Sequence, residues 1–131
     1  MDADELKERT EKFALAIIRL ASSIPRSPEA DVIRHQLVSS GTSVGANYRA
    51  ACRARSRAEF ISKMGIVEEE ADETGYWLEL LTESGMAKPA QTAGLLKEAR
   101  ELIAIFSASR RTAKSQTAAG LNRKSAMGNR Q

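Results

Sequence analysis

The sequence contains one cysteine and one histidine in 131 residues. Cys52 has no partner for a disulfide within the chain, which excludes the cross-linked framework of a small secreted protein and favours a reducing cytoplasm. With His35 as the only other soft ligand, no zinc site can be assembled. The Glu-x-x-His pairs of di-metal bundles are also missing, because Val32 stands three residues before His35. We therefore expect no metal and no other cofactor.

Long apolar runs and helix breakers are scarce as well. No apolar stretch approaches the roughly 20 residues needed to cross a bilayer, and the N-terminal segment MDADELKERTEK lacks the apolar stretch of a secretory signal. Only three prolines and eight glycines interrupt the chain. The residues that recur, Ala, Leu, Glu, Arg and Ser, form or cap helices well. The sequence thus predicts a soluble, cytoplasmic, all-α protein.

Acidic residues are absent from the C-terminal segment 108–131, which carries six basic residues and a charge of +6. Subtracting this charge from the net charge of +3 leaves −3 for residues 1–107. The segment offers too few apolar groups to offset the entropy of ordering it. We therefore predict one folded domain at 1–107 and a disordered basic tail at 108–131.

Four segments show apolar or small residues at alternating spacings of three and four, which is typical of helices with one buried face. The four stripes are Leu6, Thr10, Phe13, Ile17, Leu20 and Ile24; Ile33, Leu37, Ser40, Val44, Asn47 or Tyr48, and Ala51; Phe60, Met64, Val67, Ala71, Thr74, Leu78 and Leu81; and Leu95, Ala99, Leu102 and Phe106. Pro25, a capping box at Ser56 and Glu59, and Ser84-Gly85 separate them. Short connections make sequential helices antiparallel, so the pattern predicts an up-down-up-down four-helix bundle.

The second segment is unusual because its middle, residues 39–46, consists mostly of small residues. A loop competes with a helix here, since each interior glycine costs about 1 kcal/mol relative to alanine. We favour the helix, because Gly41 and Gly45 are four residues apart and share one face. Their missing side chains would let another helix approach closely, within the subunit or between subunits.

Two adjacent aromatic residues, Tyr76 and Trp77, point about 100° apart on a helix, so they cannot both face the core. One of them is a candidate anchor at an oligomer or partner interface.

Five basic residues gather around the connection between the second and third helices: Arg49, Arg53, Arg55, Arg57 and Lys63. In one interpretation they complement the carbonyl end of the second helix and pair with the acidic run at 68–73. In the other they form a nucleic-acid-binding patch, because arginine forks match phosphate oxygens. Aromatic residues nearby are few, so sequence-specific base recognition is not indicated.

Catalytic groups are missing. Cys52 and His35 are 17 residues apart on one predicted helix, about 25 Å along its axis, and no phosphate-binding glycine loop is present. The acidic run lies in mid-helix without the loop geometry of a calcium site, which favours a solvated or ion-paired face. We expect a protein that is not an enzyme.

The segment from Gln36 to Leu81 closely resembles a known family. Its signature pieces are SGTSVGANYR at 40–49, Glu59-Phe60, Lys63, Glu70-Ala71, Glu73-Thr74 and Trp77-Leu78. They resemble the bacterial four-helix-bundle proteins encoded in intervening sequences of 23S rRNA genes, and are similar to the accessory variability determinant of diversity-generating retroelements. The resemblance implies a ring-like homopentamer whose basic surface, in the retroelement members, engages RNA or DNA and a reverse transcriptase.

Two hypotheses follow. The first is a homo-oligomeric accessory protein that binds nucleic acid through the arginine-rich surface without reading bases. The second is a protein-interaction scaffold of unknown role, in which the arginines only form ion pairs within or between subunits.

Overall fold

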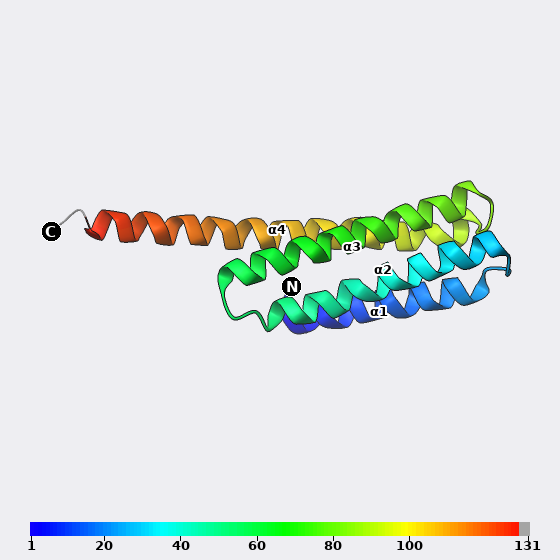
Figure 1. The fold of residues 1–131 in the computed structure, drawn as a ribbon, viewed down its shortest axis with the longest axis horizontal. Coiled ribbons are helices and arrows are strands. Elements are labelled where there is room, and N and C mark those ends of the chain that lie inside the picture. Colours follow the sequence, from blue (N-terminus) through cyan, green and yellow to red (C-terminus); the bar gives the residue numbers. More distant parts are fainter. Residues whose placement is uncertain (129–131) are drawn as a thin grey trace.

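Four α-helices make up the computed structural model, which describes the backbone of residues 1–128 and the side chains as far as Thr117. They are α1 (Ala3–Ser23), α2 (Pro28–Cys52), α3 (Arg57–Glu83) and α4 (Pro89–Gly128). Each helix runs antiparallel to the one before it and packs against it (Figure 1). The prediction of an all-α, up-down-up-down four-helix bundle is confirmed. None of the helices within residues 1–128 is long and apolar enough to cross a membrane.

The first three helices begin at side-chain caps. Asp2, Ser27 and Ser56 each accept a hydrogen bond from the backbone N–H three residues further on, at 2.8–3.0 Å. The caps at Ser27 and Ser56 follow from the sequence pattern. At the Ser56 cap, the Glu59 carboxylate accepts a hydrogen bond from the Arg55 N–H at 3.0 Å. In the usual capping box the donor is the N–H of the N-cap residue itself, here Ser56.

The connection between α1 and α2 is fixed by one arginine. Arg34 donates hydrogen bonds to the carbonyl oxygens of Ala21 and Ile24, at the C-terminal end of α1. The Ala21 carbonyl otherwise accepts only a long bond from the Ile24 N–H, at 3.4 Å, and Ile24 lies at the C-cap, so the guanidinium satisfies acceptors at the helix end. Asp31 pairs with the same guanidinium. At the same end of the molecule, Gly85 turns the chain after α3 with a φ of +79°, a region that favours glycine (Figure 1).

The core consists of the four stripes. Every member of the first stripe is buried, and so is every member of the third except the half-buried Phe60. In the second stripe the position left open at 47 or 48 is taken by Tyr48. In the fourth, Ala99, Leu102 and Phe106 are buried, and Leu95 lies at the margin.

The segment 39–46 is helical, as favoured above, and it lies directly against α1. A Cβ atom added at Gly41 would come within 2.8 Å of Ile17 Cγ2, and one at Gly45 within 3.1 Å of Thr10 Oγ1. The hydroxyl groups of this segment donate to carbonyl oxygens three or four residues back in the same helix. Small residues therefore serve close packing here, and their polar groups are satisfied locally.

α4 extends much further than predicted. Its backbone is helical to Gly128, past the domain boundary predicted at 107, and the disorder predicted for 108–131 stays a prediction. Ala113 is still buried, and Arg110 Nε lies 2.9 Å from Glu68 of α3. Extending a helix that is already nucleated is far less costly than starting one, and alanine and arginine favour it. Residues 129–131 lie outside the described residues.

Candidate nucleic-acid interface

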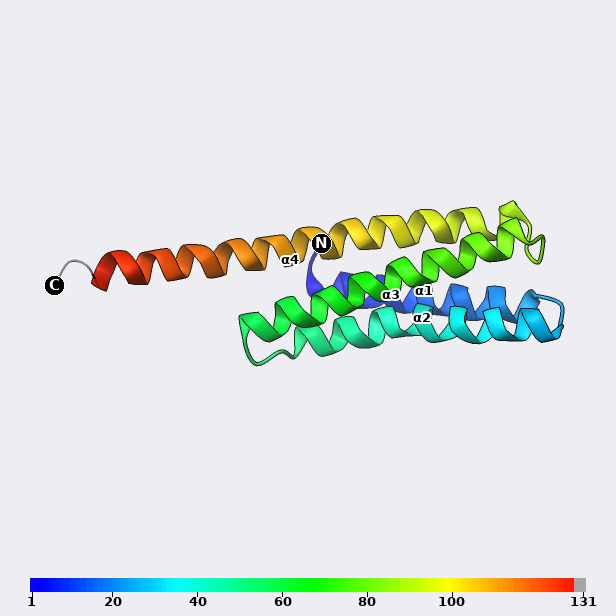
Figure 2. The same cartoon turned by 45° about the horizontal axis from the view of Figure 1, so that its top comes forward.

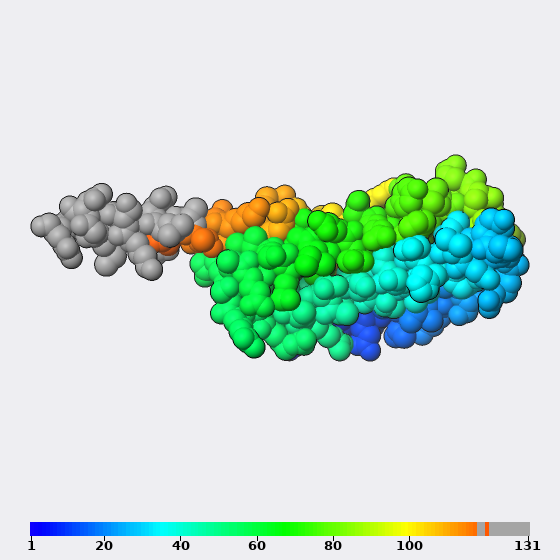
Figure 3. Space-filling model, in the orientation of Figure 1, coloured from blue at the N-terminus to red at the C-terminus, as the bar shows by residue number. Residues whose placement is uncertain are grey.

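The predicted basic residues lie at one end of the bundle, where α2 turns into α3. Only four residues, 53–56, separate the two helices. Arg53 and Arg55 lie in this connection, and Arg57 is the first residue of α3; all three are exposed. In the space-filling view the connection forms the green end of the bundle, beside the orange part of α4 (Figure 3).

Ion pairing separates Arg49 from the rest of the group. Arg49 pairs with Glu11 of α1 at 3.2 Å. By contrast, Arg53, Arg55, Arg57 and Lys63 have no ion-pair partner among the side chains described as far as Thr117. We call these four residues the connection cluster. Arg49 and Arg53, in the last turn and at the C-cap of α2, also lie where positive charge complements the helix dipole.

One residue of the acidic run of α3, Glu68, is paired from α4. Glu68 binds Arg110, and the hydrogen bond between them raises the pKa of Arg110. Further along α3, Glu79 lies 3.6 Å from Arg100. Burial, and then the neighbouring Glu73 and Glu69, raise the pKa of Glu70. The structure therefore does not make the pairing between the connection cluster and the acidic run that one interpretation required.

The aromatic side chains near the connection cluster are not open to nucleotide bases. Tyr48 is buried, and its ring packs against Phe106 with centroids 5.7 Å apart. Burial and the neighbouring Cys52 raise the pKa of the Tyr48 phenol, which is therefore neutral at physiological pH. Phe60 is half-buried against the core. The surface offers charge at this end and no platform for stacking bases.

The other predicted contact residues lie elsewhere. Gly41 and Gly45 face α1 inside the bundle, so their close approach is intramolecular. Tyr76 is 53% exposed and Trp77 is half-buried, with ring centroids 5.0 Å apart. They lie about 29 Å along α3 from Arg57, at 1.5 Å per residue. The aromatic pair and the connection cluster are thus separate surfaces.

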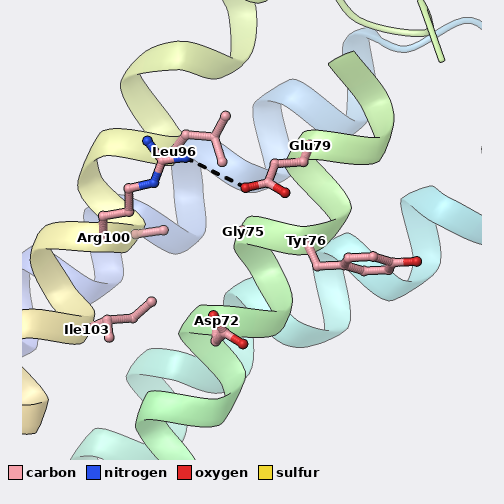
Figure 4. A pocket seen from close by; sticks show the side chains of 8 residues that line it. Asp72, Gly75, Tyr76, Glu79, Leu96, Arg100 and Ile103 are labelled. Atoms are coloured by element: carbon pink, nitrogen blue, oxygen red, sulfur yellow. Dashed lines mark ion pairs between the residues drawn. The ribbon is translucent and has the colours of Figure 1, made fainter. Parts of the chain in front are cut away.

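A hollow of about 230 Å³ lies between α3 and α4 next to Tyr76. Asp72, Glu79 and Arg100 supply its charged groups, and Leu96 and Ile103 supply apolar walls (Figure 4). The Arg100 guanidinium reaches across to Glu79, while the Tyr76 ring points away from α4. The cation of this hollow is thus already paired within the fold.

Possible metal ligands in the described part of the chain include its one histidine and its one cysteine. No three His, Cys, Asp or Glu side chains are grouped there to hold a metal ion. His35 is exposed near the start of α2, and Cys52 is half-buried at its end.

Sequence reasoning missed two residues at this end of the molecule. Arg111 and Lys114 lie on exposed positions of α4, in the segment assigned to a disordered tail. The spacing of Phe106 and Ala113, seven residues apart, was the signal that could have extended the helix to include them.

Comparison with known proteins agrees with this bundle. Residues 4–108 match the family model described as 23S rRNA-intervening sequence protein. A crystal structure of a protein of unknown function from the S23 ribosomal protein family of Bacteroides thetaiotaomicron is 33% identical, with a TM-score of 0.78, over 85% of this chain and 99% of that chain. No curated protein matches the chain. The chain belongs to the 23S rRNA-intervening sequence protein family.

Proposed function

We propose that this protein is a non-enzymatic, homo-oligomeric accessory protein that binds RNA or DNA through the connection cluster. The observation that supports this most directly is the lack of intramolecular partners. The cluster has no acidic partner among the described side chains, although the same bundle pairs Arg49, Arg100 and Arg110. Exposed arginines without counter-charges are available to phosphate oxygens, which a guanidinium fork contacts with two parallel hydrogen bonds.

Binding of this kind depends strongly on salt. Each phosphate neutralised on duplex DNA releases counterions and contributes about 0.9 to the slope of log affinity against log salt concentration. Without accessible aromatic rings, discrimination between base sequences is expected to be weak. Affinity therefore comes from the phosphate backbone, and both RNA and DNA are candidate ligands.

The oligomer is part of the proposal. Five large apolar side chains on three helices are exposed by about 40% or more of their surface, and we propose that other subunits cover them. They are Leu15, Ile18, Val32, Ile66 and Tyr76. A homopentamer, as the family resemblance implies, would repeat the connection cluster five times on one ring. Simultaneous contacts along one nucleic acid would then raise the overall affinity. A reverse transcriptase that handles the same nucleic acid is the protein partner we propose.

The test is a charge-neutralising triple variant of the connection cluster, Arg53→Gln with Arg55→Gln and Arg57→Gln. A matched control removes three exposed charges elsewhere, Arg19→Gln with Lys88→Gln and Lys97→Gln. Fluorescence anisotropy with labelled duplex RNA and DNA should show at least a tenfold loss of affinity at low salt for the cluster triple. The control should lose much less. Equal losses would refute the proposal and leave a protein-interaction scaffold that uses the exposed apolar side chains.

A further inference from the structure

α4 is longer than α3, the helix it packs against, by about a third of the length of α4. It has 40 residues and α3 has 27. At 1.5 Å per residue this makes α4 about 20 Å longer than α3. Both ribbon views show α4 continuing alone past the end where α2 turns into α3 (Figures 1 and 2). We call residues 108–128 of this helix the α4 arm.

Few of the described side chains of the α4 arm pack against the bundle. Ala113 is the last side chain described as buried, and Lys114, Ser115 and Gln116 are exposed. A Cβ added at Gly120 would meet nothing within 4 Å. The family match ends at residue 108, and the Bacteroides protein is covered almost completely by 85% of this chain. The arm is therefore an addition to a bundle that is complete without most of it.

The α4 arm carries positive charge only. The last acidic residue of the whole sequence is Glu101, and residues 108–128 contain Arg110, Arg111, Lys114, Arg123 and Lys124. Arg110 is paired with Glu68, whereas Arg111 contacts only the Ser107 hydroxyl, at 3.3 Å. Lys114 has no acidic partner among the side chains described. Like charges along one helix repel each other, and an anionic ligand removes that repulsion.

The arm and the connection cluster share one end of the molecule. In an up-down-up-down bundle the end of α2, the start of α3 and the end of α4 lie together, as Figures 1 and 2 show. The N-terminus of α1 is set back from the tip of this end in Figures 1 and 2. The cluster and the arm therefore border the same open space beside the bundle.

We propose that the α4 arm is a second nucleic-acid contact surface, and that the ligand is a duplex long enough to touch the arm and the connection cluster together. A duplex carries one negative charge per about 1.7 Å of its axis, a nearly straight charged rod that matches a straight basic helix. The length by which α4 exceeds α3, about 20 Å, faces about six base pairs, at 3.4 Å each. A single nucleotide is too short to reach both surfaces. This inference rests on the proposed function of the connection cluster.

The experiment uses full-length protein and three triple variants, each lacking three positive charges. The arm triple is Lys114→Gln with Arg123→Gln and Lys124→Gln. The cluster triple and the control triple are those given above. Glutamine keeps the helix propensity close to that of lysine and arginine, and far-ultraviolet circular dichroism with urea unfolding checks that every variant folds. Affinity for 24-base-pair RNA and DNA duplexes is measured across a series of salt concentrations.

The arm triple is expected to weaken binding at least tenfold at low salt and to reduce the salt slope by about 2.7, at 0.9 per lost phosphate contact. Combining the arm and cluster triples should weaken binding further than either alone. RNA and DNA duplexes measured in parallel identify which of the two is preferred. An arm triple that binds both duplexes as the control triple does would overturn the inference.

The two proposals can fail separately. If only the arm triple loses affinity, the cluster is not a binding surface and the arm binds alone, which refutes the joint contact. If only the cluster triple loses affinity, the proposed function stands and the arm inference falls. Vesicles of phosphatidylserine and phosphatidylcholine serve as a further probe. Vesicle binding that depends on the arm, with duplex affinity unchanged, would identify a membrane as the ligand and overturn the inference.

Discussion

Gly41 offers the sharpest test of how α1 and α2 pack. In Gly41→Ala the new Cβ would lie 2.8 Å from Cγ2, 3.0 Å from Cγ1 and 3.2 Å from Cβ of Ile17. Ile17 is completely buried, and its β-branched side chain has little freedom to rotate away. Gly65 and Gly75 of α3 are matched controls, because a Cβ at either position would meet nothing within 4 Å.

Two opposing effects set the magnitude. Replacing an interior helical glycine by alanine stabilises a helix by about 1 kcal/mol, whereas adding a methyl group to a packed interior costs about 1–3 kcal/mol. Gly41→Ala should therefore lower the free energy of unfolding by up to about 2 kcal/mol. Gly65→Ala and Gly75→Ala should raise it by about 0.4–1 kcal/mol. The sign of the effect differs between the two helices.

Urea unfolding followed by far-ultraviolet circular dichroism measures these differences. Protein concentration is held fixed, because association of subunits would add to the apparent stability. Repeating Gly41→Ala in an Ile17→Ala background removes Cγ1 and Cγ2, the two atoms that the new Cβ would approach most closely, so the substitution should become stabilising there. If Gly41→Ala stabilises the native protein as much as Gly65→Ala does, α1 and α2 do not pack as described.

Three further substitutions test the electrostatics of the fold. The pKa of Glu70 is raised, so its charged form lowers the free energy of unfolding. This loss of stability is absent below the ordinary pKa of 4.5. It grows as the pH rises from there and is complete above the raised pKa. Glu70→Gln should therefore raise the thermal midpoint at about pH 7 and leave it unchanged at about pH 3. Arg34→Lys should cost about 1–2 kcal/mol in urea unfolding, since an ammonium cannot replace the fork that caps the last carbonyls of α1. Arg9→Gln should cost about 1 kcal/mol, because Arg9 joins α1 to Glu98 and Glu101 of α4 in a half-buried pair; an unchanged urea midpoint would show that this link contributes nothing.

Most of the fold could be predicted because buried positions repeat with the helical period. The first stripe shows this best: Leu6 through Ile24 are buried at all six predicted positions, including the polar Thr10. Thr10 fits because its hydroxyl donates to the Lys7 carbonyl. The helical state of residues 39–46 could be argued only from the face shared by Gly41 and Gly45, since propensity opposed it. Contact with α1 supplied the stabilisation that the local sequence lacks.

Features that depend on side chains from distant segments could not be predicted in this way. The cap at Asp2 and the role of Arg34 need the geometry of a particular helix end. The true length of α4 needed the contacts of Arg110 and Ala113, which compositional reasoning does not include. The positions of the candidate site residues followed from the sequence, but their ion-pairing partners did not.

The freedom of the connection cluster is a consequence of the bundle geometry. Arg57 and Glu68 are 11 residues apart on α3, about 16 Å along the axis, which is beyond the reach of one side chain. Antiparallel packing places α4 along the whole acidic run, so Arg110 reaches Glu68 and Arg100 reaches Glu79. The negative charge of α3 is thus partly neutralised within the fold, while the arginines of the short α2–α3 connection are held at the end of the bundle, away from it. Because the fold pairs Glu68 and Glu79 from α4 and leaves these arginines exposed, an external polyanion is the partner that their placement favours.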